Sequence, residues 1–197
     1  MSDPDGLRIA LKEWAVLAQA MGEGRIVAMV RKGGIRERRA GFVVRHDRFF
    51  LYPTWFHEKE AELAERFRPL LADAHADRPP DGSIRIDLVC DVAGVWKVDE
   101  LERLERIANE HGLTPAAVAS RYHYRNEPGV QVVAVRVSRL NEPVELPEIR
   151  RYLGCVSWVA LDEPIPVVGA VPVVGDAEFE ERLSRLERQL GPRSETV

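Results

Sequence analysis

The sequence predicts an α+β protein in which helices flank a mixed, barrel-like β-sheet. Short apolar runs recur along the 197-residue chain, but long helices do not alternate with them as a doubly wound parallel sheet requires. Residues 83–92 alternate apolar and charged side chains, which is typical of a half-buried strand in a mixed or antiparallel sheet. With 45% hydrophobic and 30% charged residues, the chain has the composition of a folded globular protein.

The N-terminal part is expected to hold one helix and three short strands. Apolar residues spaced by three and four predict a helix over 6–21, ended by glycines. A buried strand is expected at 25–31, because this run is apolar and bounded by glycines. Two further strands, 42–44 and 48–52, are expected to form a hairpin.

The middle of the chain is expected to alternate helix, loop, strand and helix. Apolar spacing predicts a helix over 58–75, with a kink or restart at Pro69. The proline pair in 77–82 marks the clearest loop. The strand at 83–92 should place its alternate apolar residues on one face, and a capped helix should follow over 99–112.

The later elements are two strands and two short helices. Thr114 and Pro115 start a helix, because a capping hydroxyl is followed by a proline at the first helical position. Strands are expected at 130–137 and 155–161, with a helix of one or two turns at 146–153 between them.

We predict one main domain and two C-terminal segments. Residues 1–161 are expected to form a single α+β domain, with a subregion boundary at 77–82. A proline-, valine- and glycine-rich stretch at 162–175 is expected to be extended. An amphipathic C-terminal helix is expected over 176–192, with Asp176 as its cap.

The sequence also predicts the burial of individual tryptophans and the redox state of the two cysteines. Trp14 and Trp158 lie within apolar patterns and should be largely buried, whereas Trp55 lies in a turn-like setting and should be partly exposed. Cys90 and Cys155 are expected to be thiols, since two cysteines make no disulfide framework.

Several classes of protein are excluded by what the sequence lacks. No run of 18 apolar residues is present, so no membrane span is expected, and the polar, acidic residues 1–14 are unlike a secretory signal. The five histidines include no pair at i,i+4, which argues against a zinc site. We therefore expect a cytoplasmic, bacterial-type protein without a metal or cofactor.

Basic residues are concentrated in one segment, although the net charge of the chain is −4. Residues 25–57 carry eight lysine or arginine side chains and two acidic ones. Aromatic residues are interleaved with them: Phe42, Phe49, Phe50, Tyr52, Trp55 and Phe56. Cations neutralise phosphates and aromatic faces stack on bases, so the segment predicts a polyanion-binding surface. The equal alternative is a solvated strand pair whose arginines pair with the acidic stretch 58–110.

No complete catalytic signature is present. None of the four lysines has an acidic residue two positions before it, which disfavours a metal-dependent nuclease of the restriction type. Lys32, Thr54 and His57 flank short apolar strands, where sheet proteins place ligands. The alternative for these three is a solvated lysine, a turn hydroxyl and a surface histidine, so catalysis stays an open question.

Four motifs together resemble the bacterial "domain of unknown function 1802" family over about residues 7–161. They are Leu11–Ala15 (LKEWA), Arg31–Ile35 (RKGGI), Phe50–Thr54 (FLYPT) with His57, and Tyr152–Val159 (YLGCVSWV). The resemblance implies no established activity. It implies a DNA-defence context with a restriction-endonuclease-type protein partner.

A fainter similarity is to PUA-like domains of the ASCH and EVE types. It rests on the order of segments 24–32, 50–54 and 140–146. The similarity implies a PUA-like sheet. Some ASCH proteins hydrolyse acylated cytidines with a lysine, a threonine and a glutamate; Lys32 and Thr54 are similar to two of these, and no acid is assigned.

The first hypothesis is a nucleic-acid-binding module that recognises a modified or flipped base in a restriction or defence context. The alternatives are a small hydrolase acting on a nucleoside-like substrate and a non-catalytic protein-interaction partner. An open, basic, aromatic cleft would favour the binder, and a closed pocket with an acid near Lys32 would favour the enzyme. The expected binding residues are Arg31, Lys32, Arg36, Tyr52, Thr54, Trp55 and His57.

Overall fold

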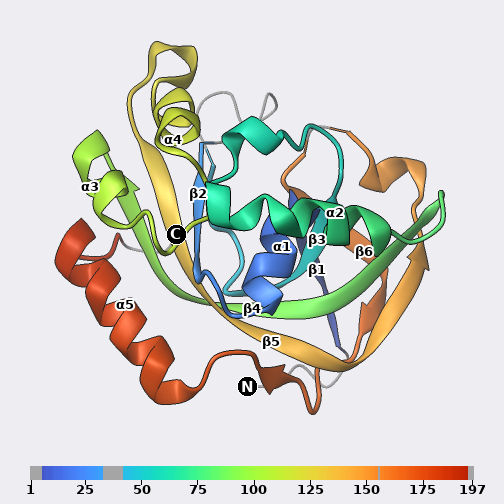
Figure 1. The fold of residues 1–197 in the computed structure, drawn as a ribbon. Helices are drawn as coiled ribbons and strands as arrows, with labels where there is room; N and C mark the ends of the chain where they lie inside the picture. Colours follow the sequence, from blue (N-terminus) through green and yellow to red (C-terminus); the bar gives the residue numbers. More distant parts are fainter. Residues whose placement is uncertain (1–5, 33–41, 155, 195–197) are drawn as a thin grey trace.

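The structure is a computed structural model that describes residues 6–32, 42–154 and 156–194. Its described strands form one seven-stranded sheet in the order β2-β5-β4-β3-β1-β6, with β7 paired to β5 (Figure 1). Only β1 and β3 pair in parallel, and the other described pairs are antiparallel. The strands are β1 (Leu7–Trp14), β2 (Ala28–Arg31), β3 (Arg48–Thr54), β4 (Ser83–Val98), β5 (Val130–Pro147), β6 (Trp158–Ile165) and β7 (Val171–Pro172).

Helices flank this mixed sheet, which confirms the predicted α+β class. The α-helices are α1 (Ala15–Gly22), α2 (Pro69–Ala76), α3 (Leu101–Arg106), α4 (Pro115–Tyr122) and α5 (Asp176–Leu190). In Figure 1, α1 and α2 cover one side of the sheet, and α5 lies on the outside of the long β4–β5 pair. Among the described residues, no helix is both long and apolar enough to cross a membrane.

The sheet is open but strongly curved, so it is barrel-like without being a closed barrel. Its curvature comes from β4 and β5, whose pairing shifts register twice, between Ile86 and Leu88 and between Val92 and Gly94. The edge strands β2 and β6 are not paired to each other. At one end of the opening, Arg31 at the end of β2 donates a hydrogen bond to the carbonyl of Lys12 on β1, 3.0 Å away.

Two hydrophobic clusters lie on opposite faces of the sheet. The bulge after Ile86 exchanges the faces of β4, because Ile86 packs in the smaller cluster and Leu88 packs in the larger one. The single apolar face predicted for 83–92 is therefore wrong at this point. Cys90 is a buried free thiol in the larger cluster, while Cys155 lies outside the described residues.

The predicted helix over 6–21 is half wrong, because its first half is the strand β1. Ala10 packs in one hydrophobic cluster and Leu11 in the other, so both faces of this strand are buried. A strand covered on both faces loses the apolar–polar alternation that identifies strands, and its remaining apolar spacing imitates a helix.

Three further predictions need correction. The hairpin of 42–44 and 48–52 does not form: β3 pairs with β1 and β4, and the carbonyl of Val43 accepts a hydrogen bond from the Trp158 indole at 3.1 Å. The helix over 58–75 is reduced to two 3-10 turns followed by α2, which starts at Pro69 as expected for a proline at the first helical position. The helix over 146–153 is one 3-10 turn.

The burial predicted for Trp14 and Trp158 is wrong, whereas the partial exposure predicted for Trp55 is confirmed. Trp14 and Trp158 are half-buried, like Trp55, whereas Trp96 is 1% exposed. Its indole donates to the carbonyl of Gly191 at the end of α5, 2.9 Å away.

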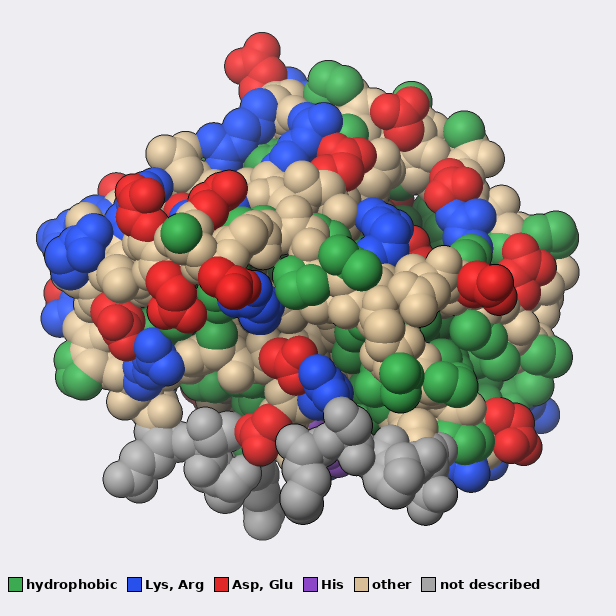
Figure 2. Space-filling view, turned by 90° about the horizontal axis from the view of Figure 1, so that it is seen from below, with side chains coloured by type: hydrophobic (Ala, Val, Ile, Leu, Met, Phe, Trp, Pro, Cys, Tyr) green, Lys and Arg blue, Asp and Glu red, His purple; other side chains and the backbone are tan. Residues whose placement is uncertain are grey.

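The C-terminal helix α5 confirms the predicted amphipathic pattern and packs on the main core. Gly175, rather than Asp176, occupies its N-cap position. Arg182 on α5 forms a buried ion pair with Glu110, with 2.7 Å between the charged atoms. On the face shown in Figure 2, acidic and basic side chains are interspersed over the part where α5 lies, so this part is not a one-sign surface.

His111 should make stability depend on pH. It is 2% exposed; its Nδ1 accepts from the Leu113 N–H, so its neutral form carries the proton on Nε2, which faces the Leu104 carbonyl. Burial lowers the pKa of His111 from 6.5 to about 4. A histidine whose folded pKa is lowered is protonated more readily in the unfolded chain, so stability falls as pH drops from 6.5 towards 4. We expect a loss of about 3 kcal/mol.

Denaturant unfolding of the wild type and of His111→Gln across this pH range measures the contribution. The glutamine variant should show a shallower fall in unfolding free energy with acid, because the titrating group is gone while the other acids titrate as before. Identical slopes for the two proteins would show that His111 does not carry the effect.

Candidate functional site

A cleft of two connected cavities opens where the ends of β1, β2 and β3 meet. The cavities measure about 360 and 680 Å³ and share part of their lining. We call the smaller one the cationic limb; its charged lining residues are Lys12, Glu13, Arg31, Lys32 and Arg121. We call the larger one the aromatic limb; it is lined by Tyr52, Trp55, Phe56, Leu153 and Val156, together with Glu148.

The wall between the two limbs is built from alternate residues of two parallel strands. Lys12 and Trp14 of β1 are paired in register with Tyr52 and Thr54 of β3, so their side chains project on the same face. Lys12, Trp14 and Thr54 line both limbs. The strand pair therefore places a cation, an indole and a hydroxyl at the junction.

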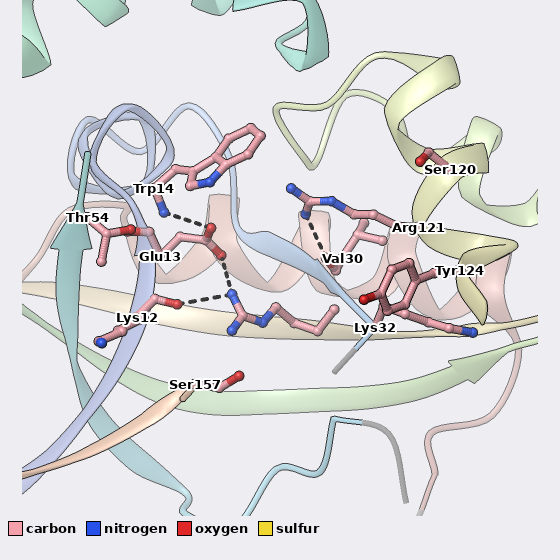
Figure 3. Close-up of a pocket in the computed structure, with 11 residues that line it drawn as sticks. Lys12, Glu13, Trp14, Val30, Lys32, Thr54, Ser120, Arg121, Tyr124 and Ser157 are labelled. Atoms are coloured by element: carbon pink, nitrogen blue, oxygen red, sulfur yellow. Dashed lines mark hydrogen bonds and ion pairs between the residues drawn. The ribbon is translucent and has the colours of Figure 1, made fainter. Parts of the chain in front are cut away.

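A buried ion pair forms the centre of the cationic limb. Glu13 is 5% exposed, and its carboxylate accepts from the Trp14 N–H at 2.9 Å and from Arg31 at 3.1 Å. Arg31 also donates to the Lys12 carbonyl (Figure 3). The guanidinium is thus fixed by a carboxylate and a carbonyl, and it lies 4.9 Å from the ring centroid of Phe42. Arg31 is a preorganised cation rather than a mobile surface arginine.

Arg121 lies across the limb from Glu13, on the last turn of α4. It donates to the Val30 carbonyl at 3.0 Å and stacks on the Trp14 ring, with 5.1 Å between guanidinium and centroid. Burial lowers the pKa of Arg121, while the nearby Glu13 carboxylate acts in the opposite direction. The limb therefore contains four cations and one carboxylate, although each of the four cations already donates to a protein acceptor.

Lys32 has a structural position that the sequence did not predict. Its ammonium donates to the backbone carbonyls of Tyr122, Glu127 and Gly129, and so ties the end of α4 to the start of β5. Desolvation lowers the pKa of Lys32, and the Glu127 charge partly compensates. In Figure 3 its side chain extends away from Glu13. Lys32 lines the cationic limb, but its ammonium group stabilises the fold through these hydrogen bonds to backbone carbonyls.

The aromatic limb has a polar floor. The Tyr52 hydroxyl donates to Glu148 at 2.7 Å, and Lys12 lies over the Tyr52 ring, 5.5 Å from its centroid. Burial raises the pKa of Tyr52, and hydrogen bonding to the Glu148 carboxylate raises it further. Tyr52 is 1% exposed, so it offers no face for stacking. Phe56, which is 78% exposed, is the aromatic side chain with an open face at this limb.

The other predicted site residues have mixed placements. Thr54 donates to the Glu13 carbonyl at 3.1 Å, and the Trp55 indole donates to the Ala74 carbonyl at 2.9 Å. His57 is exposed, adopts a positive φ of 66° and lines the aromatic limb. Arg36 lies outside the described residues. Six of the seven predicted residues therefore line the cleft: Lys32 lines the cationic limb, Arg31 and Thr54 line both limbs, and Tyr52, Trp55 and His57 line the aromatic limb.

The lining residues that the sequence reasoning missed include Lys12, Glu13, Trp14, Arg121 and Glu148. Lys12 and Trp14 had a usable signal, because positions i and i+2 share one face of a strand, but the segment was interpreted as a helix. Glu13 lies between them in the same misassigned segment, whereas Arg121 and Glu148 are brought in from distant positions. The basic segment 25–57 is not the source of the cleft's charge as a whole, since Arg25 pairs with Glu23 and Arg48 with Asp91.

The hydrolase constellation of Lys32, Thr54 and His57 does not assemble as expected. The ammonium of Lys32 is directed at backbone carbonyls, and Thr54 donates to the Glu13 carbonyl rather than to a base. Within the described part of the chain, no group of three histidine, cysteine, aspartate or glutamate side chains could hold a metal ion.

These features define an α+β protein with an open, curved mixed sheet and a basic, aromatic cleft at the ends of its strands. The chain belongs to the family described as "Domain of unknown function (DUF1802)", whose model matches residues 10–185. This confirms the family resemblance seen in the motifs.

Comparison with solved structures finds the ASCH type named by the fainter resemblance. The chain is similar to the crystal structure of ASCH from Zymomonas mobilis, with 14% identity and a TM-score of 0.45 over 89% of this chain and 92% of that one. It is also similar to a point mutant of the Zymomonas mobilis protein, with 15% identity and a TM-score of 0.41 over 92% and 98%. No curated protein matches the chain.

Proposed function

We propose that the protein binds single-stranded nucleic acid in this cleft, with phosphates in the cationic limb and an unstacked or flipped base in the aromatic limb. The observation that carries the proposal is the junction of the two limbs. Lys12, Trp14 and Arg31 line both cavities, so a cation-lined path leads directly into a pocket with aromatic and aliphatic walls. A nucleotide matches this arrangement, because its anionic phosphate would lie in the cationic limb and its flat base in the aromatic limb.

The size and the charges of the cleft suit this ligand. The aromatic limb, at about 680 Å³, lies within the range of pockets that enclose small ligands. The cations of the cleft attract phosphates without sequence preference, and exposed aromatic faces stack on any base. An open cleft with basic and aromatic walls was the feature expected to favour a binding module over a hydrolase.

The finer statements of the sequence analysis remain proposals. Recognition of a modified base, a restriction or defence setting, an endonuclease-type protein partner and a cytoplasmic location are implied by the motifs and composition. We retain all four as hypotheses, and the binding experiment below is the first step in testing them.

The expected result of a salt titration tests the proposal. Fluorescence titration of labelled single-stranded DNA and RNA and of duplexes should show an affinity that falls with salt and favours single strands. Replacing Lys12 with glutamine removes one cation from the junction, so the slope of log K against log salt should become less steep by about 0.7. Phe56→Ala should instead weaken binding by about 1–3 kcal/mol with little change in slope, because stacking is not electrostatic.

Matched controls separate the cleft from the rest of the surface. Arg188→Gln removes one exposed cation from α5, and Val168→Ala truncates an 82% exposed apolar side chain; neither residue lines the cleft. Both variants should bind as the wild type does. The proposal fails if no nucleic acid binds at low salt, or if Lys12→Gln and Arg188→Gln change the slope equally.

A further inference from the structure

Glu148 places a carboxylate inside the otherwise apolar and cationic aromatic limb. It follows the end of β5, and its backbone N–H donates to the Gly82 carbonyl at 2.8 Å, which fixes the chain at this point. Its side-chain Oε1 accepts from the Tyr52 hydroxyl at 2.7 Å. The carboxylate is thus held in one orientation at the floor of the pocket.

The partner of Glu148 is a neutral group that stays protonated. Burial and the carboxylate itself raise the pKa of Tyr52, so the phenol donates throughout the physiological range. One hydrogen bond uses a single acceptor site of the carboxylate, whose two oxygens offer about four. The remaining acceptor capacity is available to a ligand in the limb, and Tyr52 positions the carboxylate without neutralising it.

A carboxylate in a base-binding pocket distinguishes bases by their hydrogen-bond donors. Guanine presents two adjacent donors, the ring N1–H and the 2-amino group, which match the two oxygens of one carboxylate. Uracil and thymine flank their single N3–H with carbonyl oxygens, and neutral cytosine and adenine place a lone pair beside their amino group. Those lone pairs would face the negative charge of Glu148 and would be repelled by it.

We propose that Glu148 is a specificity-determining residue that selects guanine for the aromatic limb, with Tyr52 as its positioning residue. The inference rests on the proposed function, since it assigns the base that the limb accepts. The same carboxylate opposes the binding of phosphate in the neighbouring limb. Its effect on a ligand without guanine should therefore be unfavourable, and its effect on guanine favourable.

The experiment compares short oligothymidine strands that differ only in one central nucleotide, which is guanine, hypoxanthine, adenine, cytosine or thymine. Hypoxanthine keeps the N1–H of guanine and lacks only the 2-amino group. We expect the wild type to prefer the guanine strand over the hypoxanthine strand by about 10-fold or more, because a hydrogen bond to a charged group is lost.

Glu148→Gln should lose most of this preference while binding the all-thymine strand as tightly as the wild type or more tightly. This opposite sign is the decisive readout, because a variant damaged in its fold would bind every strand more weakly. Tyr52→Phe should reduce the preference to an intermediate value. Glu145→Gln, which alters an exposed carboxylate of β5 that does not line the cleft, should leave it unchanged.

The possible failures are distinguishable. Binding of all strands with equal affinity, or a guanine preference that survives Glu148→Gln, overturns the role of Glu148 and leaves the binding function intact. Absence of binding to every strand overturns the proposed function and this inference together.

Discussion

Replacing Arg182 with methionine is expected to lower the free energy of unfolding by about 3–5 kcal/mol, one of the two largest losses we predict for a single substitution. The guanidinium is buried and donates to the Glu110 carboxylate at 2.9 Å and to the carbonyls of Gly24 and Arg25 at 2.6 and 3.0 Å. It therefore joins α5 to the turn after α1 and to the segment before α4. Removing it leaves the Glu110 carboxylate, which is 3% exposed, without its principal countercharge.

The comparison with two other variants identifies the cause. Glu110→Leu combined with Arg182→Met should recover part of the loss, because an apolar pair avoids the unpaired buried charge. Arg185→Met removes a half-exposed arginine that lies 3.7 Å from the same carboxylate, and it should cost about 1 kcal/mol or less. Denaturant unfolding measures all three. Equal losses for Arg182→Met and Arg185→Met would contradict the assignment.

The parts of the fold that could be predicted from sequence are those determined by local signals. Helix α4 begins at Pro115 as expected, and the Thr114 hydroxyl accepts from the Ala117 N–H at 3.2 Å. Helix α5 could be predicted from the spacing of its apolar residues alone. Strand β1 could not be recognised in the same way, because its pattern is set by two hydrophobic clusters that only the folded sheet brings together.

The residues of the candidate site also divide into those that have a local sequence signal and those that have none. Thr54 could be proposed because it lies at the end of an apolar strand, and Arg31 and Trp55 because they belong to the basic segment 25–57 and its interleaved aromatic residues. The pairs Arg31–Glu13 and Tyr52–Glu148 join residues 18 and 96 positions apart, and no local pattern connects them. The segment 25–57 is rich in basic residues, but some of their charges are neutralised by ion pairs such as Arg48–Asp91. The density of basic residues alone therefore did not locate the cleft.

Trp96 illustrates what apolar patterning misses, and it leads to the second large effect. It lies on β4, where Gly94 allows the ring to pack against the backbone: a Cβ at Gly94 would lie 2.6 Å from the indole. The indole N–H donates to the Gly191 carbonyl, so the ring links the sheet to the end of α5. Gly191, the C-cap residue of α5, adopts a φ of 87° and a ψ of −161°, a conformation that glycine reaches without steric cost.

Trp96→Ala is expected to lower the free energy of unfolding by about 3–5 kcal/mol, since it removes a fully buried aromatic side chain and leaves a cavity. Trp55→Ala should cost less than half as much, because Trp55 is half-buried beside the cleft. Equilibrium unfolding of both variants under the same conditions provides the comparison. Equal losses would mean that the burial of Trp96 does not determine its contribution. A larger loss for Trp55→Ala would indicate that the cleft, rather than the contact between β4 and α5, is the more stabilising part of the molecule.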